Sequence, residues 1–71
     1  MTKKQMLEEM YDDYKFERMA YDYADANGYD TEAKEHWYAS FVLESLAARM
    51  FNLSTNAFFD RYVDEKYATI A

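Results

Sequence analysis

The 71-residue sequence contains no cysteine, no proline and a single glycine, Gly28. Without cysteine the chain forms no disulfide and no thiolate metal site, and a reducing cytoplasm is the compartment that we expect. Without proline, and with one glycine, few positions interrupt a helix, so the sequence predicts an all-α protein. Apolar runs of about 20 residues, the length of a membrane span, are also missing, and the first residues do not resemble a signal peptide.

Aliphatic residues are scarce as well, since Leu, Ile, Val and Phe together number 12 of 71. A share this small is typical of disordered chains. Eight tyrosines, five methionines and one tryptophan supply the missing apolar area, because aromatic side chains bury more surface per residue. We therefore expect an ordered core built from aromatic residues and methionine.

Negative charge is in surplus. The chain has 14 acidic residues against 8 Lys and Arg, a net charge of −6, and ten of the acids lie within residues 1–35. A field of this sign repels nucleic acids and anionic membranes and attracts basic partners. We therefore expect no direct nucleic-acid binding and no membrane partner.

One domain over residues 1–71 is all that this length allows. Its first predicted helix covers about residues 3–26, because Thr2 and Gln5 have the spacing of a capping box and Gly28 follows the last turn. The apolar residues of this helix lie on two nearly opposite faces. Either the helix kinks near residue 15, or its two ends meet different neighbours.

The second predicted helix covers about residues 32–51, after a cap at Asp30 or Thr31, and the third about residues 55–66. Apolar residues surround most of the second helix, which is typical of a buried helix. The sequence therefore predicts a small three-helix bundle with its central helix buried.

The connection between the second and third predicted helices has the residue types of a tight helix–helix turn at regular positions. Ala48 is a small residue at the expected helix contact, Asn52 tolerates the left-handed turn conformation, Leu53 supplies the apolar plug and Ser54 caps the next helix. In these positions residues 48–62 resemble the helix-turn-helix motif. The resemblance implies DNA binding, usually by a dimer.

Under that resemblance, Thr55 and Asn56 would contact base edges and Arg61 would contact phosphate. Phosphate contacts supply most of the affinity in such complexes. The third predicted helix carries few basic residues, and Asp60 and its acidic neighbours would repel the phosphates of DNA. We expect Phe59 to lie in the core. We therefore interpret this turn as a structural corner between two helices, and DNA binding is the alternative function.

Metal and catalytic patterns are weak. Residues 25–35 resemble part of an EF-hand loop, but Tyr23 and Lys34 stand where the strongest acidic ligands belong. His36, the only histidine, has Glu32 four residues before it, an ordinary exposed pair. We therefore expect no metal, no cofactor and no enzymatic activity.

Acidic residues and tyrosines alternate along the first predicted helix. Tyrosine is enriched at protein interfaces, and acids beside aromatic rings favour Arg- and Lys-rich surfaces. A solvated acidic face that only maintains solubility is the simplest interpretation. The predicted partner-binding residues are Glu8, Glu9, Tyr11, Asp12, Asp13, Tyr14, Glu17, Tyr21 and Asp22.

We favour a small acidic protein-binding module that docks this helix on a basic surface of a partner protein. In its sharpest form it is an inhibitor that mimics nucleic acid and occupies a nucleic-acid-binding protein. Small acidic helical proteins of bacteriophages often act this way, and this chain is similar to them in size and charge. The alternatives are a dimeric helix-turn-helix DNA-binding protein and a structural homo-oligomer, so a homodimer is also considered.

Overall fold

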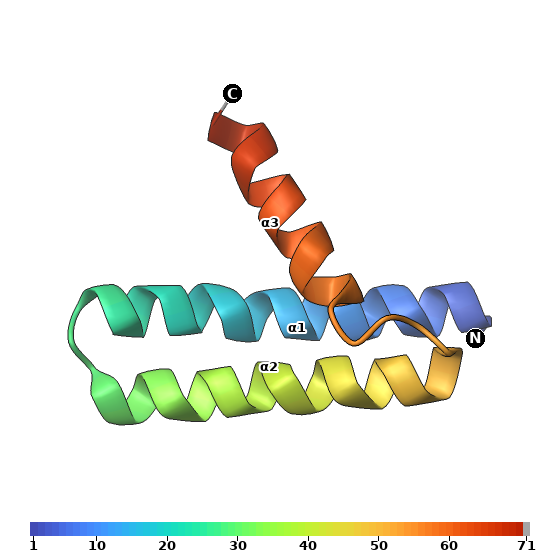
Figure 1. The fold of residues 1–71 in the computed structure, drawn as a ribbon, viewed down its shortest axis with the longest axis horizontal. Helices are drawn as coiled ribbons and strands as arrows, with labels where there is room; N and C mark the ends of the chain where they lie inside the picture. Colours follow the sequence, from blue (N-terminus) through green and yellow to red (C-terminus); the bar gives the residue numbers. More distant parts are fainter. Residues whose placement is uncertain (71) are drawn as a thin grey trace.

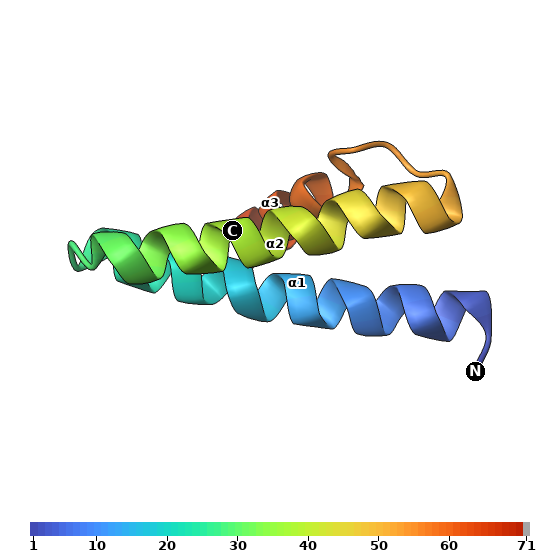
Figure 2. The same cartoon turned by 90° about the horizontal axis from the view of Figure 1, so that it is seen from below.

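The computed structural model consists of three helices: α1 (Lys3–Ala26), α2 (Asp30–Phe51) and α3 (Ala57–Ile70). It describes the backbone of residues 1–70 and the side chains of residues 1–68, and that part of the chain contains no strand. α1 and α2 form an antiparallel hairpin, whereas α3 crosses one side of the hairpin and points away from it (Figures 1 and 2). The predicted all-α class and the three helices are confirmed.

α1 has the predicted bounds because both of its ends are fixed by local hydrogen bonds. Thr2 Oγ1 accepts from the Gln5 backbone N–H at 3.1 Å, and the Gln5 side chain accepts from the Thr2 N–H at 2.8 Å. At the other end Gly28 adopts a left-handed φ of 74°. The Tyr29 N–H then reaches the Ala24 carbonyl at 2.9 Å, which closes the helix as a Schellman motif.

α2 begins two residues earlier than predicted. The N-cap residue is Tyr29, which makes no side-chain cap hydrogen bond, so a cap at Asp30 or Thr31 is wrong. The turn is already complete at this point, because the Ala33 N–H donates to the Tyr29 carbonyl at 2.9 Å. Acidic side chains in the first turn, including Glu32, complement the positive end of the helix dipole instead.

The turn after α2 has the predicted left-handed residue. Asn52 has φ 54° and ψ 48°, and the Leu53 N–H donates to the Ala48 carbonyl at 3.0 Å. Ser54 Oγ accepts from the Asn56 N–H at 3.3 Å, so it fixes the turn that precedes the helix. α3 consequently starts two residues later than predicted and continues four residues further.

The core is a small cluster of aromatic rings between α1 and α3. Tyr11 and Tyr14 from α1 lie within 5.5 Å and 5.4 Å of the Phe58 ring centroid, and Tyr62 packs edge-on against Tyr14 at 6.4 Å. Ala47 of α2 is buried beside them. Partly buried apolar residues surround this cluster: Leu7, Met10, Leu43 and Phe51. The predicted aromatic part of the core is confirmed, but methionine contributes only through Met10, because the other four methionines are exposed.

The predicted burial of the central helix is not found in the single chain. α2 packs along α1, but α3 lies mainly over the aromatic cluster and leaves most of α2 uncovered. Phe59, predicted to lie in the core, is also exposed by 39%. The large apolar residues of α2 that remain exposed are Trp37, Tyr38, Phe41, Val42, Leu46 and Met50.

The left-handed turn gives a direct test of the α2–α3 connection. Asn52→Ala is expected to lower the free energy of unfolding by about 1 kcal/mol, because a Cβ without a local hydrogen bond disfavours this conformation. Asn52→Gly is the matched control and is expected to leave stability unchanged or raised. Urea unfolding followed by circular dichroism measures both, and equal stability of the two variants would contradict this geometry.

Candidate protein-docking surface

Two of the predicted partner-binding residues are buried. Tyr11 is 1% exposed and Tyr14 is 2% exposed, so their rings form the core rather than a docking face. The Tyr11 hydroxyl donates to the Glu65 carboxylate of α3. Their assignment to a docking face is therefore corrected, because both rings are used to hold α3 against α1.

A third predicted residue, Glu8, is bound within the chain. Its carboxylate receives two hydrogen bonds from the Arg61 guanidinium, at 3.0 Å and 2.9 Å. This bidentate contact lowers the pKa of Glu8 below its usual value. Arg61 also lies 3.9 Å above the Tyr11 ring and 3.6 Å from Glu65, so its charge is engaged on the α1–α3 seam.

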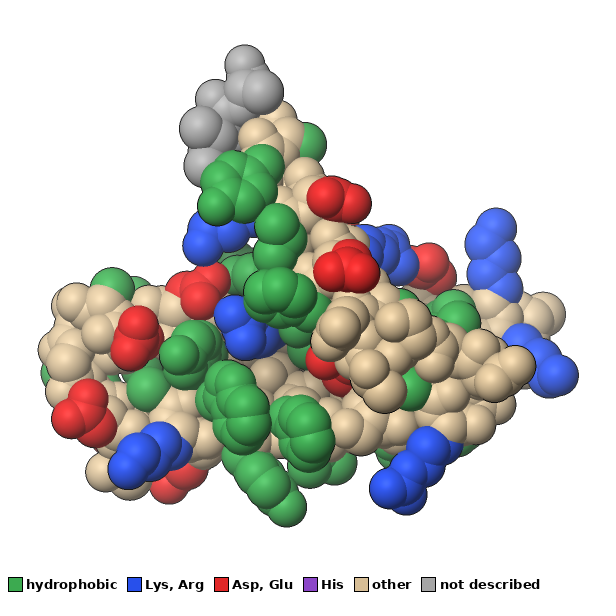
Figure 3. All heavy atoms as spheres, in the orientation of Figure 1, with side chains coloured by type: hydrophobic (Ala, Val, Ile, Leu, Met, Phe, Trp, Pro, Cys, Tyr) green, Lys and Arg blue, Asp and Glu red, His purple; other side chains and the backbone are tan. Residues whose placement is uncertain are grey.

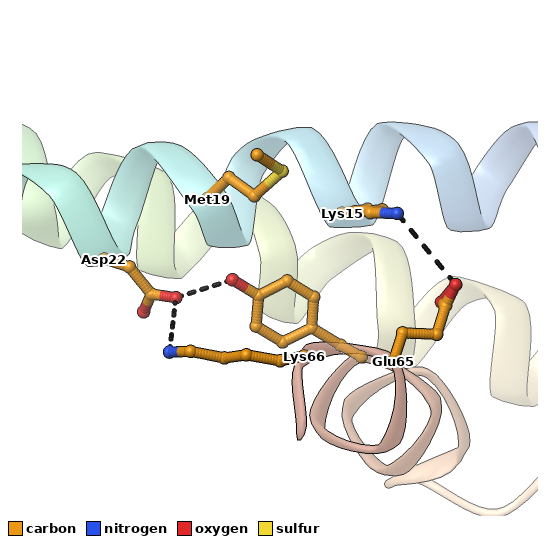
Figure 4. Close-up of a pocket in the computed structure, with 6 residues that line it drawn as sticks. Lys15, Met19, Asp22, Glu65 and Lys66 are labelled. Atoms are coloured by element: carbon orange, nitrogen blue, oxygen red, sulfur yellow. Dashed lines mark hydrogen bonds and ion pairs between the residues drawn. The ribbon is translucent and has the colours of Figure 1, made fainter. Parts of the chain in front are cut away.

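Asp22 is likewise bound to α3, at the edge of a pocket of about 390 Å³ between α1 and α3 (Figure 4). Its carboxylate accepts from the Tyr62 hydroxyl at 2.5 Å and from Lys66 Nζ at 3.4 Å. On the other side of the pocket, Lys15 lies 3.9 Å from Glu65. The charged groups of this pocket pair across it, and their contacts fasten α3 to α1.

Glu17 connects α1 to α2. Its carboxylate lies 2.7 Å from His36 Nδ1, and both side chains are partly buried. The predicted partner of His36 was Glu32, one turn away on the same helix, and this assignment is wrong. The side chain of His36 turns toward α1 because that face of α2 packs against the neighbouring helix, whereas Glu32 remains exposed.

Three predicted acids remain on the outer side of α1, on the same helix face as one large apolar side chain. Glu9, Asp12 and Asp13 are exposed, and among the described residues none makes a hydrogen bond or an ion pair with another side chain. Phe16 lies one turn further on and is 68% exposed. These four residues follow the i, i+3, i+4, i+7 spacing of one helix face. We call them the acidic strip.

Phe16 was missed as a site residue, although its spacing from Glu9 and Asp13 was visible in the sequence. The signal is an apolar residue at i+7 from an acid, on the face that does not carry the core tyrosines. Tyr21, which was predicted to bind a partner, is half-buried with Arg18 at 4.9 Å above its ring. It lies away from the acidic strip, toward α2 and α3.

The helix-turn-helix positions are poorly equipped for DNA. Thr55 and Asn56 are exposed, as the resemblance requires, but Arg61 is engaged with Glu8. Glu44 of α2 accepts from the Phe59 backbone N–H at 2.8 Å, so a carboxylate occupies the start of α3, where a phosphate would bind. Burial raises the pKa of Glu44 above its usual value, while this backbone hydrogen bond favours the charged form.

Comparisons with models of protein families, with characterised proteins and with solved structures find no significant match to this chain. No helix among the described residues is long and apolar enough to cross a membrane. The same part of the chain contains no cluster of three or more His, Cys, Asp or Glu side chains that could hold a metal ion.

The buried tyrosines predict loss of stability at high pH. Burial raises the pKa of Tyr14 and Tyr62 to about 12, above the value near 10 of an unfolded tyrosine. Because the folded state holds the proton more tightly, stability is retained below pH 10 and is lost as the pH rises toward 12. Circular dichroism and tyrosinate absorbance, recorded together between these pH values, are expected to show unfolding.

Tyr14→Phe and Tyr23→Phe are matched variants for this titration. Tyr14→Phe removes a buried titrating hydroxyl and is expected to move the alkaline unfolding midpoint upward. Tyr23 is 64% exposed, so Tyr23→Phe is expected to leave the midpoint where it is. An unchanged midpoint in the Tyr14 variant would show that this ring is not buried in the folded protein.

Proposed function

We propose that this chain is a non-enzymatic protein-binding module that docks the acidic strip of α1 on a basic surface of a partner protein. The observation that carries the proposal is the division of the acids on α1. Glu8, Glu17 and Asp22 are bound to α2 and α3, whereas Glu9, Asp12 and Asp13 have no such partners. The first three acids are explained by their contacts within the chain. The second three have no such role, so they are available to bind a partner.

Charge and apolar area favour binding together on this strip. Exposed carboxylates on a chain of net charge −6 accelerate encounter with a basic partner and set its orientation. Phe16 offers an apolar anchor among them, which a partner's Arg or Lys can cover by a cation–π contact. An aromatic anchor with polar groups at its edge is the common anatomy of protein interfaces.

The sharper form of the proposal is mimicry of nucleic acid. A helix that presents neighbouring carboxylates offers a row of negative charges to a surface that normally binds phosphates. The partner would then be a nucleic-acid-binding protein, and the chain would inhibit it by occupying its basic groove. Competition with nucleic acid for the same partner distinguishes this form from a general acidic docking module.

Removing the charge of the strip tests the proposal. The triple variant Glu9→Gln, Asp12→Asn, Asp13→Asn keeps size and polarity and removes three charges. Three exposed ion pairs of about 0.5 kcal/mol each correspond to a roughly tenfold loss of affinity. The measurement is a pull-down from nuclease-treated lysate of the native cell, followed by titration of the retained basic protein at several salt concentrations.

The control triple Glu32→Gln, Glu35→Gln, Asp64→Asn removes the same charge from exposed positions outside the strip. We expect this control to retain the partner, and the strip variant to lose both affinity and its salt dependence. Equal weakening by the two triples would assign the effect to net charge alone. An unchanged affinity in the strip variant would refute the proposed site.

Direct DNA binding is the alternative function that the helix-turn-helix resemblance implies, and it needs a separate test. Because Glu8 engages Arg61 and Glu44 occupies the start of α3, we expect no salt-dependent retention of the chain on immobilised duplex DNA. Retention that is lost in the double variant Thr55→Ala, Asn56→Ala would instead favour the DNA-binding function. Circular dichroism of the variant confirms that its helices are intact.

A further inference from the structure

A continuous aromatic surface covers the side of the molecule on which α2 and α3 diverge. Figure 3 shows hydrophobic side chains gathered over the middle of α2 and along α3, with a basic side chain between them. Trp37 and Phe41 of α2 stack at 5.5 Å with an angle of 8° between their rings, and are 46% and 50% exposed. We call this surface the aromatic face; its residues are Arg18, Tyr21, Trp37, Phe41 and Phe59.

Arg18 is the cation of this face, and it connects the ring of Tyr21 on α1 with the ring of Phe59 on α3. The Arg18 guanidinium lies 4.9 Å from the Tyr21 ring and 5.3 Å from the Phe59 ring. Tyr21 and Trp37 line the same pocket at the end of the hairpin. Tyr21 and Phe59 are thus held by Arg18, and Trp37 and Phe41 hold each other by stacking, so less side-chain entropy is lost when another surface covers these rings.

Charge indicates which surface can cover this face. Residues 37–51 of α2 carry only Glu44 and Arg49, and Glu44 is turned to the backbone of α3. A basic partner is attracted by the acidic strip rather than by this nearly neutral segment. Two copies of an acidic chain repel one another elsewhere, so a neutral apolar face is where they can approach with the least electrostatic cost.

The single chain is less compact than a typical monomer of its size. The chain exposes 5314 Å², whereas a compact monomer of 8.5 kDa is expected to expose about 4,650 Å². A standard interface covers ~800 Å² on each partner, so a second copy can cover surface that this chain does not bury by itself. The radius of gyration of 12.6 Å likewise exceeds the ~11 Å expected for this length.

From these observations we infer that two copies of the chain pack through the aromatic face and form a homodimer. This assignment is independent of the docking function, because the acidic strip lies elsewhere on α1. Tyr21 and Phe16 are five residues apart, which is about 140° around a helix. Dimerisation therefore buries Tyr21 with its aromatic neighbours and leaves both acidic strips outside.

The dimer also completes a core that is small for a single chain. Domains of this size are only marginally stable unless oligomerisation or a covalent link supplements the core. In the dimer, Trp37 and Phe41 become buried, and α3, which is fixed to the hairpin mainly through Phe58 and Tyr62, gains a second packing surface. Aromatic residues and arginine are also the residues most enriched in interface hot spots.

The test is the oligomeric state of two matched variants, measured by sedimentation velocity over a range of concentrations. Phe41→Glu places a charge in the aromatic face and is expected to shift the chain from dimer to monomer. Leu46→Glu adds the same charge to the same helix, at a side chain that is 45% exposed and about 140° around the helix from Phe41, and is expected to remain dimeric. A monomeric wild type, or a dimer lost only in the Leu46 variant, would overturn the proposal.

Trp37 provides a second readout that needs no substitution, since it is the only tryptophan. Burial in the dimer is expected to protect its fluorescence from acrylamide, and dilution into the monomer range is expected to shift its emission to longer wavelength. A wild-type dimer in which acrylamide quenches Trp37 as freely as an exposed indole would place the interface elsewhere. Because this measurement uses the wild-type chain, it tests the proposed interface even if Phe41→Glu fails to fold.

Discussion

The packing of Phe58 and Tyr62 against Tyr11 and Tyr14 is the contact on which the rest of the structure depends. α1 and α2 form a hairpin through their length, but α3 has few other apolar contacts that hold it in place. Once the four rings meet, Arg61 lies beside Glu8 and the Tyr62 hydroxyl reaches Asp22. The polar contacts between α1 and α3 are thus consequences of one aromatic cluster.

This cluster also divides the surface into regions of different chemistry. The acids on the α3 side of α1 are bound by Arg61, Lys66 and a tyrosine hydroxyl, whereas the exposed acids on the outer side make no ion pair with another described side chain. The same crossing of α3 leaves the aromatic residues of α2 without a cover. The proposed docking strip and the proposed dimer face both follow from the place where α3 packs.

Local structure was largely predictable from the sequence, because caps and turns depend on neighbouring residues. The capping box at Thr2, the turn at Gly28 and the left-handed Asn52 all follow from such local chemistry, and the bounds of α1 were predicted correctly. Predicted burial failed for α2, because it depends on the direction in which α3 leaves the turn. An apolar circumference is equally consistent with a helix covered by its own chain and with one covered by a second copy.

The candidate site was predicted only in part, for a related reason. The spacing of Leu7, Tyr11 and Tyr14 placed the two tyrosines on an apolar face, yet their composition suggested an interface. The structure resolves this conflict in favour of the core. Which acids find partners on α3 could not be inferred, because Glu8 and Arg61 are 53 residues apart in sequence.

The salt dependence of self-association distinguishes apolar packing of two copies, with their acidic strips facing outward, from charge pairing between them. Sedimentation equilibrium of the wild-type chain at low and high salt gives the dimer dissociation constant directly. Salt screens repulsion between the two negative chains, so we expect a tighter dimer at high salt. A dimer that weakens as salt is added would show that charge pairs hold the copies together, which would contradict dimerisation through the aromatic face.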